Sequence, residues 1–260
     1  MQNPAMQKPA RSKGTKTMTT RRFYALPCQF DGSAIILDED ETRHLRDVLR
    51  LKVGDNANVF DGEGREFECR IDTIEKRQSK LSIETEVTPA SPESPLDLTL
   101  AAVLLKGDKL DLVVQKAVEL GVNRFIPMTS VRCDVKAADP SKRTARWKRI
   151  AMEATKQCGR ARLMRIEDVA DLRELIDSTN GEDVTRIHFS ERDGGSFDTV
   201  EGAKKILAFI GPEGGWDDAE IEKATAAGII SITFGGRILK ADTAAISIAS
   251  ILQHRFGDVN

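Results

Sequence analysis

Two glycine-rich segments near the C-terminal end of the chain are the residues best suited to binding a ligand. Residues 211–215 read Gly-Pro-Glu-Gly-Gly and directly follow the apolar run 206–210. Residues 235–243 read Gly-Gly-Arg-Ile-Leu-Lys-Ala-Asp-Thr and follow a second apolar run, 229–234. Because glycine has no Cβ atom, the backbone of such segments can approach a flat ligand closely. We expect both segments to lie at the carboxyl ends of adjacent sheet strands, where open α/β sheets bind ligands.

Residue spacing argues against several other kinds of site. Neither glycine segment continues as Gly-Lys-Ser/Thr or matches GxGxxG, so ATP hydrolysis and Rossmann dinucleotide binding lose support. The four cysteines, at positions 28, 69, 133 and 158, never stand at CxxC spacing, and the three histidines are scattered. We therefore expect no metal site, and the unclustered cysteines fit a reducing compartment.

A small strand-rich domain is predicted for residues 20–88. One helix, residues 41–51, interrupts its strands and carries Arg43, Arg46 and Arg50 on one face. Three prolines in residues 89–95 predict a linker. The basic residues 1–19 are expected to form a disordered tail. Short, partly alternating apolar runs predict strands at 34–37, 57–60, 66–71 and 81–87, with a hairpin turn at 61–64.

Residues 96–260 predict an α/β domain, because strand and helix patterns alternate as they do in mainly parallel sheets. Buried-type apolar runs predict strands at 98–105, 124–128, 186–189, 205–210 and 229–234. Amphipathic spacing and terminal glycines predict helices at 108–120, 142–158, 217–227 and 243–256.

The charge distribution points to a nucleic-acid partner. The composition, with 40% hydrophobic and 31% charged residues, is that of a soluble globular protein, and no run of 18 apolar residues predicts a membrane span. The formal net charge is −2, yet residues 142–165 contain nine Lys or Arg against one acid, Glu153. Such a segment predicts contact with phosphates. Trp147 within it either packs inside the domain or stacks on a base.

Five motifs, in this order along the chain, resemble one known family. They are residues 106–109, 115–122, 156–160, 211–215 and 237–245. Together they are similar to the RsmE family of 16S ribosomal RNA uridine-N3 methyltransferases, which belongs to the SPOUT superfamily. The resemblance covers residues 22–257, and residues 43–55 resemble the PUA-like N-terminal domain of that family.

The resemblance implies a fold that residue spacing does not show. It is a PUA-like β-barrel domain followed by a SPOUT α/β domain with a deep trefoil knot, a feature nearly absent from other proteins. The resemblance also implies S-adenosylmethionine as methyl donor, a homodimer, and 16S ribosomal RNA within the assembled 30S subunit as partner. The residues expected to bind the cofactor are Phe189, Ser190, Ile210, Gly211, Pro212, Glu213, Gly214, Gly215, Phe234, Gly235, Ile238, Leu239, Thr243 and Ala244.

Methyl transfer to uridine N3 needs a proton acceptor and a group that stabilises the uridylate. Asp242 is the candidate for the acceptor or its positioning, and Arg237 and Lys240 are candidates for holding phosphate or the developing charge. Asp242 could instead cap the last helix, and both roles could hold. The family usually has Arg and Glu where this chain has Lys240 and Asp242, which leaves the catalytic roles open.

Candidate RNA contacts come from both basic regions and from the first motif. They are Arg43, Arg46, Arg50, Lys106, Arg143, Arg146, Arg149 and Arg160. Two other functions remain open: a related SPOUT methyltransferase acting on tRNA, or a catalytically silent RNA-binding factor in ribosome assembly. The expected location is the cytoplasm, or an organelle if the basic N-terminal segment is a transit peptide.

Overall fold

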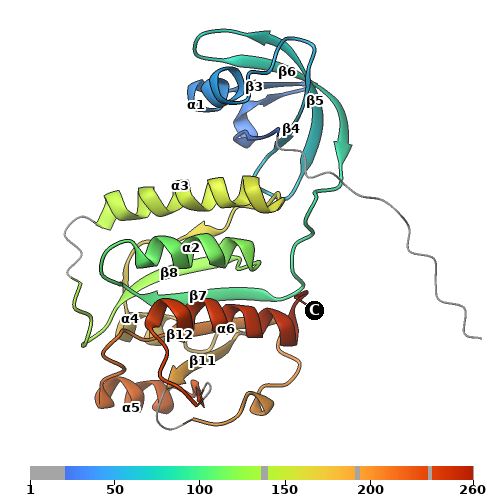
Figure 1. The fold of residues 1–260 in the computed structure, drawn as a ribbon. Helices are drawn as coiled ribbons and strands as arrows, with labels where there is room; N and C mark the ends of the chain where they lie inside the picture. The colour runs from blue at the N-terminus through green and yellow to red at the C-terminus, as the bar shows by residue number, and fades with distance from the viewer. Residues whose placement is uncertain (1–20, 136–139, 191–193, 234–235, 260) are drawn as a thin grey trace, which may run out of the picture.

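The chain is built on two separate β-sheets (Figure 1). The structure is a computed structural model that describes residues 21–135, 140–190, 194–233 and 236–259. The predicted basic tail, residues 1–19, lies outside these residues. Within them, no helix has the length and apolar character needed to cross a membrane.

The first sheet is curled and has six strands in the order β1-β4-β5-β6-β3-β2 (Figure 1). Its core contains Phe23, Leu45, Ile71 and Leu81. The predicted hairpin at 61–64 joins two antiparallel strands, β4 and β5, which confirms it. The strands are β1 (Arg22–Tyr24), β2 (Phe30–Asp31), β3 (Ala34–Leu37), β4 (Asn56–Phe60), β5 (Glu66–Ile74) and β6 (Ser79–Val87), with a short 3-10 turn, η1 (Pro27–Gln29), between the first two.

The helix predicted for residues 41–51 is irregular. It begins as α1 (Glu39–Arg43), capped by the side chain of Asp38, and widens into a π-helical turn, η2 (His44–Val48). The chain leaves this turn at Arg50, the one described non-glycine residue with positive φ, at 54°. The predicted helical stretch is therefore confirmed, but it spans residues 39–48 and its second half is π-helical, which periodicity cannot distinguish from an α-helical turn.

The second sheet has seven strands, all parallel, in the order β10-β8-β7-β12-β11-β13, with β9 paired to β8. The glycine segments follow β12 and β13, which are not adjacent as predicted, because β11 lies between them. The strands are β7 (Asp97–Val103), β8 (Arg124–Thr129), β9 (Arg165–Ile166), β10 (Ala170–Asp171), β11 (Thr185–Ser190), β12 (Lys205–Ile210) and β13 (Ile230–Thr233).

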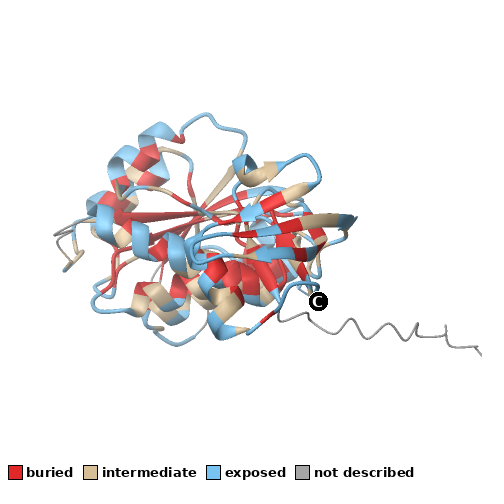
Figure 2. Ribbon diagram, turned by 90° about the horizontal axis from the view of Figure 1, so that it is seen from above, coloured by how far each residue is buried: buried red, intermediate tan, exposed pale blue. Residues whose placement is uncertain are grey.

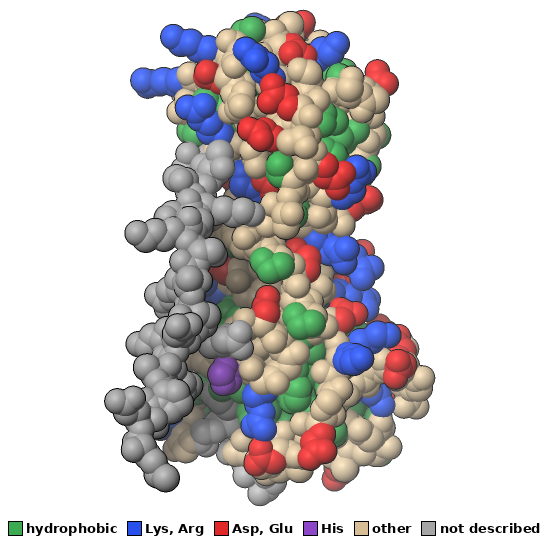
Figure 3. Space-filling view, turned by 90° about the vertical axis from the view of Figure 1, so that its right-hand side faces the viewer, with side chains coloured by type: hydrophobic (Ala, Val, Ile, Leu, Met, Phe, Trp, Pro, Cys, Tyr) green, Lys and Arg blue, Asp and Glu red, His purple; other side chains and the backbone are tan. Residues whose placement is uncertain are grey.

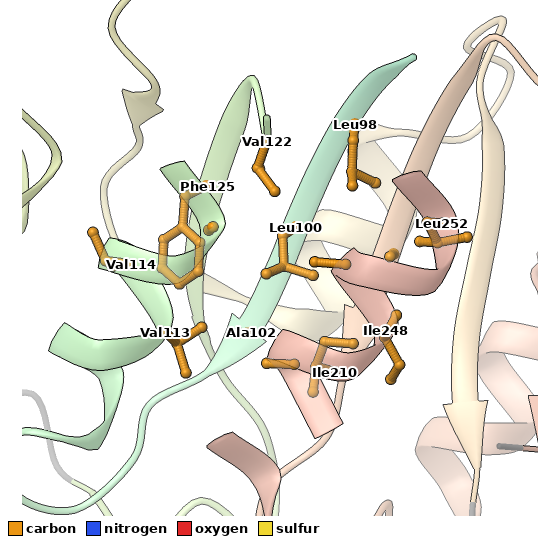
Figure 4. Packing of buried hydrophobic residues seen from close by; sticks show 14 of the residues in the cluster. Leu98, Leu100, Ala102, Val113, Val114, Val122, Phe125, Ile210, Ile248 and Leu252 are labelled. Carbon is orange, nitrogen blue, oxygen red and sulfur yellow. The ribbon is translucent and has the colours of Figure 1, made fainter. Parts of the chain in front are cut away.

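Helices cover both faces of this sheet, and the buried residues gather on the strands and on the helix sides that face them (Figure 2). Alternate residues along each strand face opposite layers, so Leu98, Leu100 and Ala102 of β7 pack on one side (Figure 4). Ala101 and Val103 pack on the other side. The first layer contains α2 (Lys109–Glu119), α3 (Pro140–Cys158) and α6 (Ala241–Phe256), and the second contains α4 (Leu172–Ser178) and α5 (Asp218–Ala226), while η3 (Phe197–Thr199) is a short 3-10 turn.

The two sheets are joined at the C-terminal end of α3, which lies between the first sheet and α2 (Figure 1). Arg22 of β1 is 6% exposed and forms a two-pronged ion pair with Glu66, with distances of 3.0 and 2.8 Å. The same guanidinium donates to the backbone oxygens of Thr155, Lys156 and Arg160 at 2.9 to 3.1 Å. Carbonyls at the end of a helix lack internal donors, so Arg22 satisfies groups that the helix itself cannot.

A second buried contact runs in the opposite direction across the same boundary. The ammonium of Lys156, on α3, pairs with the carboxylate of Glu41, on α1, and the two side chains are 8% and 5% exposed. Burial raises the pKa of Glu41, and Lys156 partly offsets this effect. The N-terminal domain therefore contributes the cation Arg22 to this boundary, and the C-terminal domain contributes Lys156.

Removing the ammonium of Lys156 should destabilise the chain. In Lys156→Met, the Glu41 carboxylate stays buried without its cation, which costs about 3 kcal/mol or more. Lys148→Met, at an exposed position on the same helix, is the control and should change the free energy of unfolding by less than about 0.5 kcal/mol. Urea unfolding measures both. Adding Glu41→Gln to Lys156→Met should recover part of the lost stability. Equal unfolding midpoints for Lys156→Met and Lys148→Met would contradict the buried ion pair.

Candidate active site

An open pocket of about 110 Å³ lies at the carboxyl ends of the β11 and β12 strands. Its wall is formed in part by the two glycine segments and by the start of α6. The structure therefore brings both glycine segments to one pocket, and their role in binding a ligand stays a prediction. The residues that line the pocket are Phe189, Ser190, Ile210, Gly211, Pro212, Glu213, Gly215, Trp216, Ile221, Arg237, Ile238, Leu239, Ala241, Ala244 and Ile248.

The first glycine segment is held in place by a tryptophan that the sequence analysis did not select. The Nε1 atom of Trp216 donates a 2.7 Å hydrogen bond to the backbone oxygen of Phe189, which fixes the loop against β11. A Cβ atom at Gly211 would lie 2.9 Å from the Trp216 ring, so glycine is required there. Gly215, at φ +70°, closes a turn in which its amide donates to the Pro212 oxygen at 3.0 Å.

Gly214 does not line the pocket, although the sequence analysis placed it there. A Cβ atom at this position would meet Arg132 at 3.5 Å, which is an ordinary contact on the side away from the pocket. Arg132 donates to the Gly214 oxygen at 3.4 Å and pairs with Asp217 at 3.4 Å. Gly214 therefore faces the segment after β8, because the tight turn rotates each residue of the loop in a different direction.

The second glycine segment brings one predicted catalytic residue, Arg237, to the pocket wall. Lys240 is exposed and stands at the N-cap of α6 without a side-chain cap, so the alternative that Asp242 caps this helix was wrong. Asp242 lies in the first turn of α6 and, like Lys240, is not among the residues that line the pocket, although Ala241 and Ala244 are. Its Oδ1 atom is buried and accepts no hydrogen bond from any described residue.

Three further residues predicted for the cofactor site are not found in the pocket wall, for different reasons. Thr243 is exposed and is not part of the pocket wall. Phe234 and Gly235 lie outside the described residues. The apolar residues Ile221 and Ile248 line the pocket but were missed, because helix periodicity marks them only as core positions.

A buried imidazole lies behind the tryptophan. His188 of β11 is 3% exposed and meets Trp216 edge-on, with 6.2 Å between the ring centroids. Burial lowers the pKa of His188, because the interior disfavours the charged form. The ring is therefore neutral at pH 7 and contributes shape to this side of the pocket rather than charge.

The predicted RNA contacts separate into exposed and buried residues. Arg160 is 3% exposed, pairs with Glu93 at 2.6 Å and donates to the oxygens of Val118 and Val122, so its assignment to RNA was wrong. Trp147 is 3% exposed and donates to Asp111, which excludes base stacking in this structure. Arg43, Arg46, Arg50, Lys106, Arg146 and Arg149 reach the surface, at least in part, and Arg143 is half-buried.

Several of the exposed cations are paired with acids. Arg43 pairs with Asp40 at 2.8 Å, and Arg46 pairs with Asp47 at 2.7 Å. On the face shown in Figure 3, the visible basic and acidic side chains are mixed. Any RNA surface among the described residues is therefore local, as the net charge of −2 requires.

Comparisons with known proteins identify the family. A family model described as an RNA methyltransferase domain matches residues 92–253, and one described as an RNA methyltransferase PUA domain matches residues 37–84. Ribosomal RNA small subunit methyltransferase E of Aquifex aeolicus is 33% identical over 224 residues, which is 86% of this chain and 95% of the relative. This chain belongs to that family. The corresponding Bacillus subtilis protein is 30% identical over 226 residues, 83% of this chain and 88% of the relative.

Two solved structures of similar proteins extend the comparison. The family member from Neisseria gonorrhoeae, crystallised with S-adenosyl methionine, has a TM-score of 0.85 and 33% identity, and the match covers 92% of this chain and 99% of that chain. A methyltransferase from Legionella pneumophila, also in complex with this cofactor, has a TM-score of 0.84 and 29% identity, with the same coverage. The family fold therefore extends over both sheets.

Two glycine variants should separate the pocket wall from its outer side. Gly211→Ala places a methyl group 2.9 Å from Trp216, so the loop must shift and affinity for S-adenosylmethionine should fall by about tenfold or more. Gly214→Ala adds a methyl group with only an ordinary contact and should keep affinity within about twofold. Calorimetric titration measures both, and equal losses in the two variants would contradict this placement of the loop.

Proposed function

We propose that this chain transfers the methyl group of S-adenosylmethionine to N3 of a uridine in 16S ribosomal RNA. The observation that carries the proposal is the pocket between the two glycine segments, in a fold that matches a cofactor-bound family member with a TM-score of 0.85. The names of the curated relatives support small-subunit ribosomal RNA as the substrate.

The pocket fits such a cofactor chemically. Ile210, Leu239 and Ile248 provide apolar walls suited to a purine ring. The charged residues that line it, Glu213 and Arg237, match the ammonium and the carboxylate of the amino-acid part. When bound, S-adenosylmethionine supplies a methyl group that is already electrophilic because the sulfur is positively charged.

The side chains at the start of α6 have the chemistry that the nucleotide requires. N3 of uridine carries a proton at pH 7, which must leave before or during attack on the methyl group. The buried Oδ1 atom of Asp242 has a lone pair that no described residue uses, so it can accept that proton. Arg237 at the pocket wall and exposed Lys240 can stabilise the uridylate or hold a phosphate.

Asp242→Asn tests the proton acceptor. The amide keeps the shape of the carboxylate but cannot accept the proton, so the single-turnover rate on 30S subunits should fall by about 10²-fold or more. Stability should change by no more than about 1 kcal/mol, because the side chain caps nothing and loses only its charge near the helix N-terminus. Lys240→Arg with Asp242→Glu, the usual family pair, is the control and should remain active. Near-normal methylation by Asp242→Asn would refute the role of Asp242 as a base.

We also propose that the N-terminal end of α3 contacts RNA. Arg143 and Arg146 line a hollow with Gly107 and Asp111, and this hollow adjoins the segment between β7 and α2. Arg149 lies one turn further along the same helix and is exposed. Together they would guide the RNA backbone toward the pocket.

Reversing the three arginines to glutamate should weaken RNA binding and flatten its dependence on salt, because fewer counterions are released. Affinity for S-adenosylmethionine should not change, since none of the three lines the pocket. Filter binding between 50 and 200 mM salt, the range in which such contacts act strongly, measures the slope. A slope equal to that of the parent chain would assign these residues to a solvated face only.

We further propose the trefoil knot, the homodimer, the 30S context and a cytoplasmic location that the family resemblance implies. The dimer is supported by two features of this chain. Ile238 is 83% exposed, and α6 presents the small, partly exposed residues Ala244, Ser247 and Ser250. Sedimentation at micromolar concentration tests the dimer, and a monomer would count against it.

A further inference from the structure

The first residue of α2, Lys109, contacts the wall of the pocket. Its ammonium donates to Oε1 of Glu213, which lies 104 residues later in the chain and lines the pocket. The two side chains are each 37% exposed, so the ion pair lies at the rim. Pairing of β7 with β12 brings the two segments together, because both strands end at the same edge of the sheet.

A second carboxylate, that of Asp242, acts on the same ammonium. The hydrogen bond to Glu213, and then the charges of Glu213 and Asp242, raise the pKa of Lys109, while burial and Lys106 oppose this. Lys109 therefore contacts the carboxylate of Glu213 directly, whereas Asp242 acts on it only through its charge.

The properties of an ammonium group explain what this arrangement can do. Lysine has three N–H donors on a flexible stem, and the structure shows one of them bound to Glu213. A charge-assisted hydrogen bond of this kind is stronger than a neutral one and holds the carboxylate in one orientation.

We propose that Lys109 is a positioning residue for methyl transfer. Its ammonium fixes the Glu213 carboxylate at the pocket wall, where the amino-acid part of the cofactor would lie. This assignment rests on the proposed function. The other cations nearby differ in position: Lys106 pairs with Asp134 at 2.7 Å, while Arg237 and Lys240 precede α6.

Three variants of the full-length chain test the assignment. Lys109→Met removes the charge, and Lys109→Arg keeps it. Lys116→Met is the matched control, because Lys116 is on the same helix and its loss removes a comparable ion pair, with Glu119, outside the pocket. The measurements are calorimetric affinity for S-adenosylmethionine, single-turnover methylation at increasing 30S concentration, and the unfolding midpoint.

For Lys109→Met we expect a maximal rate about tenfold lower or more, the effect of losing one charge-assisted hydrogen bond. The half-saturating 30S concentration should stay within about twofold of that of the parent chain, and cofactor affinity should fall. Lys109→Arg should restore most of the lost rate and most of the lost affinity. The assignment is overturned if Lys109→Met matches Lys116→Met in rate and affinity, or if only the half-saturating concentration rises. Failure of the parent chain to methylate 30S subunits would instead refute the proposed function, and cofactor affinity would still test the contact between Lys109 and Glu213.

Discussion

The buried guanidinium of Arg22 is the contact on which the arrangement of the two domains depends. Burying a charge is costly unless every polar atom finds a partner. Arg22 meets this condition in full: its five N–H donors reach two oxygens of Glu66 and three backbone oxygens at the end of α3. Because three acceptors belong to one domain and the carboxylate to the other, sliding the domains apart would leave the charge without partners.

The contact between Arg22 and the C-terminal end of α3 is linked to contacts at the other end of this helix. α3 packs on α2 through Trp147, whose ring nitrogen donates to Asp111 at 3.0 Å, and Arg146 pairs with the same carboxylate at 2.7 Å. α2 begins at Lys109, which contacts the pocket wall. A continuous series of packed helices therefore connects the first sheet to the pocket.

Features that depend on a few neighbouring residues could be predicted from the sequence. Contacts between residues that are distant in the chain could not. The glycine segments were found because loss of Cβ atoms after an apolar run is visible in a few residues. The position of β11 between β12 and β13 depends on the path of the whole chain, which apolar runs do not encode. Arg160 was assigned to RNA because it lies in a basic run, yet it is buried and its guanidinium bonds to Glu93 and two backbone oxygens. Trp216 follows the loop directly, but only the fold shows that its ring supports Gly211.

The same reasoning explains why the sequence suggested Asp242 as a helix cap and the structure does not. A capping carboxylate uses its oxygens on backbone amides, whereas in this structure the helix begins one residue before Asp242 and its side chain caps nothing. Leaving a buried oxygen without a donor costs about 1 to 3 kcal/mol, so the fold gains no stability from it. Such an atom is useful where a proton arrives from outside the chain. Ala241 and Ala244, nearby on the same helix, line the pocket, so a proton acceptor at Asp242 would stand close to the pocket wall.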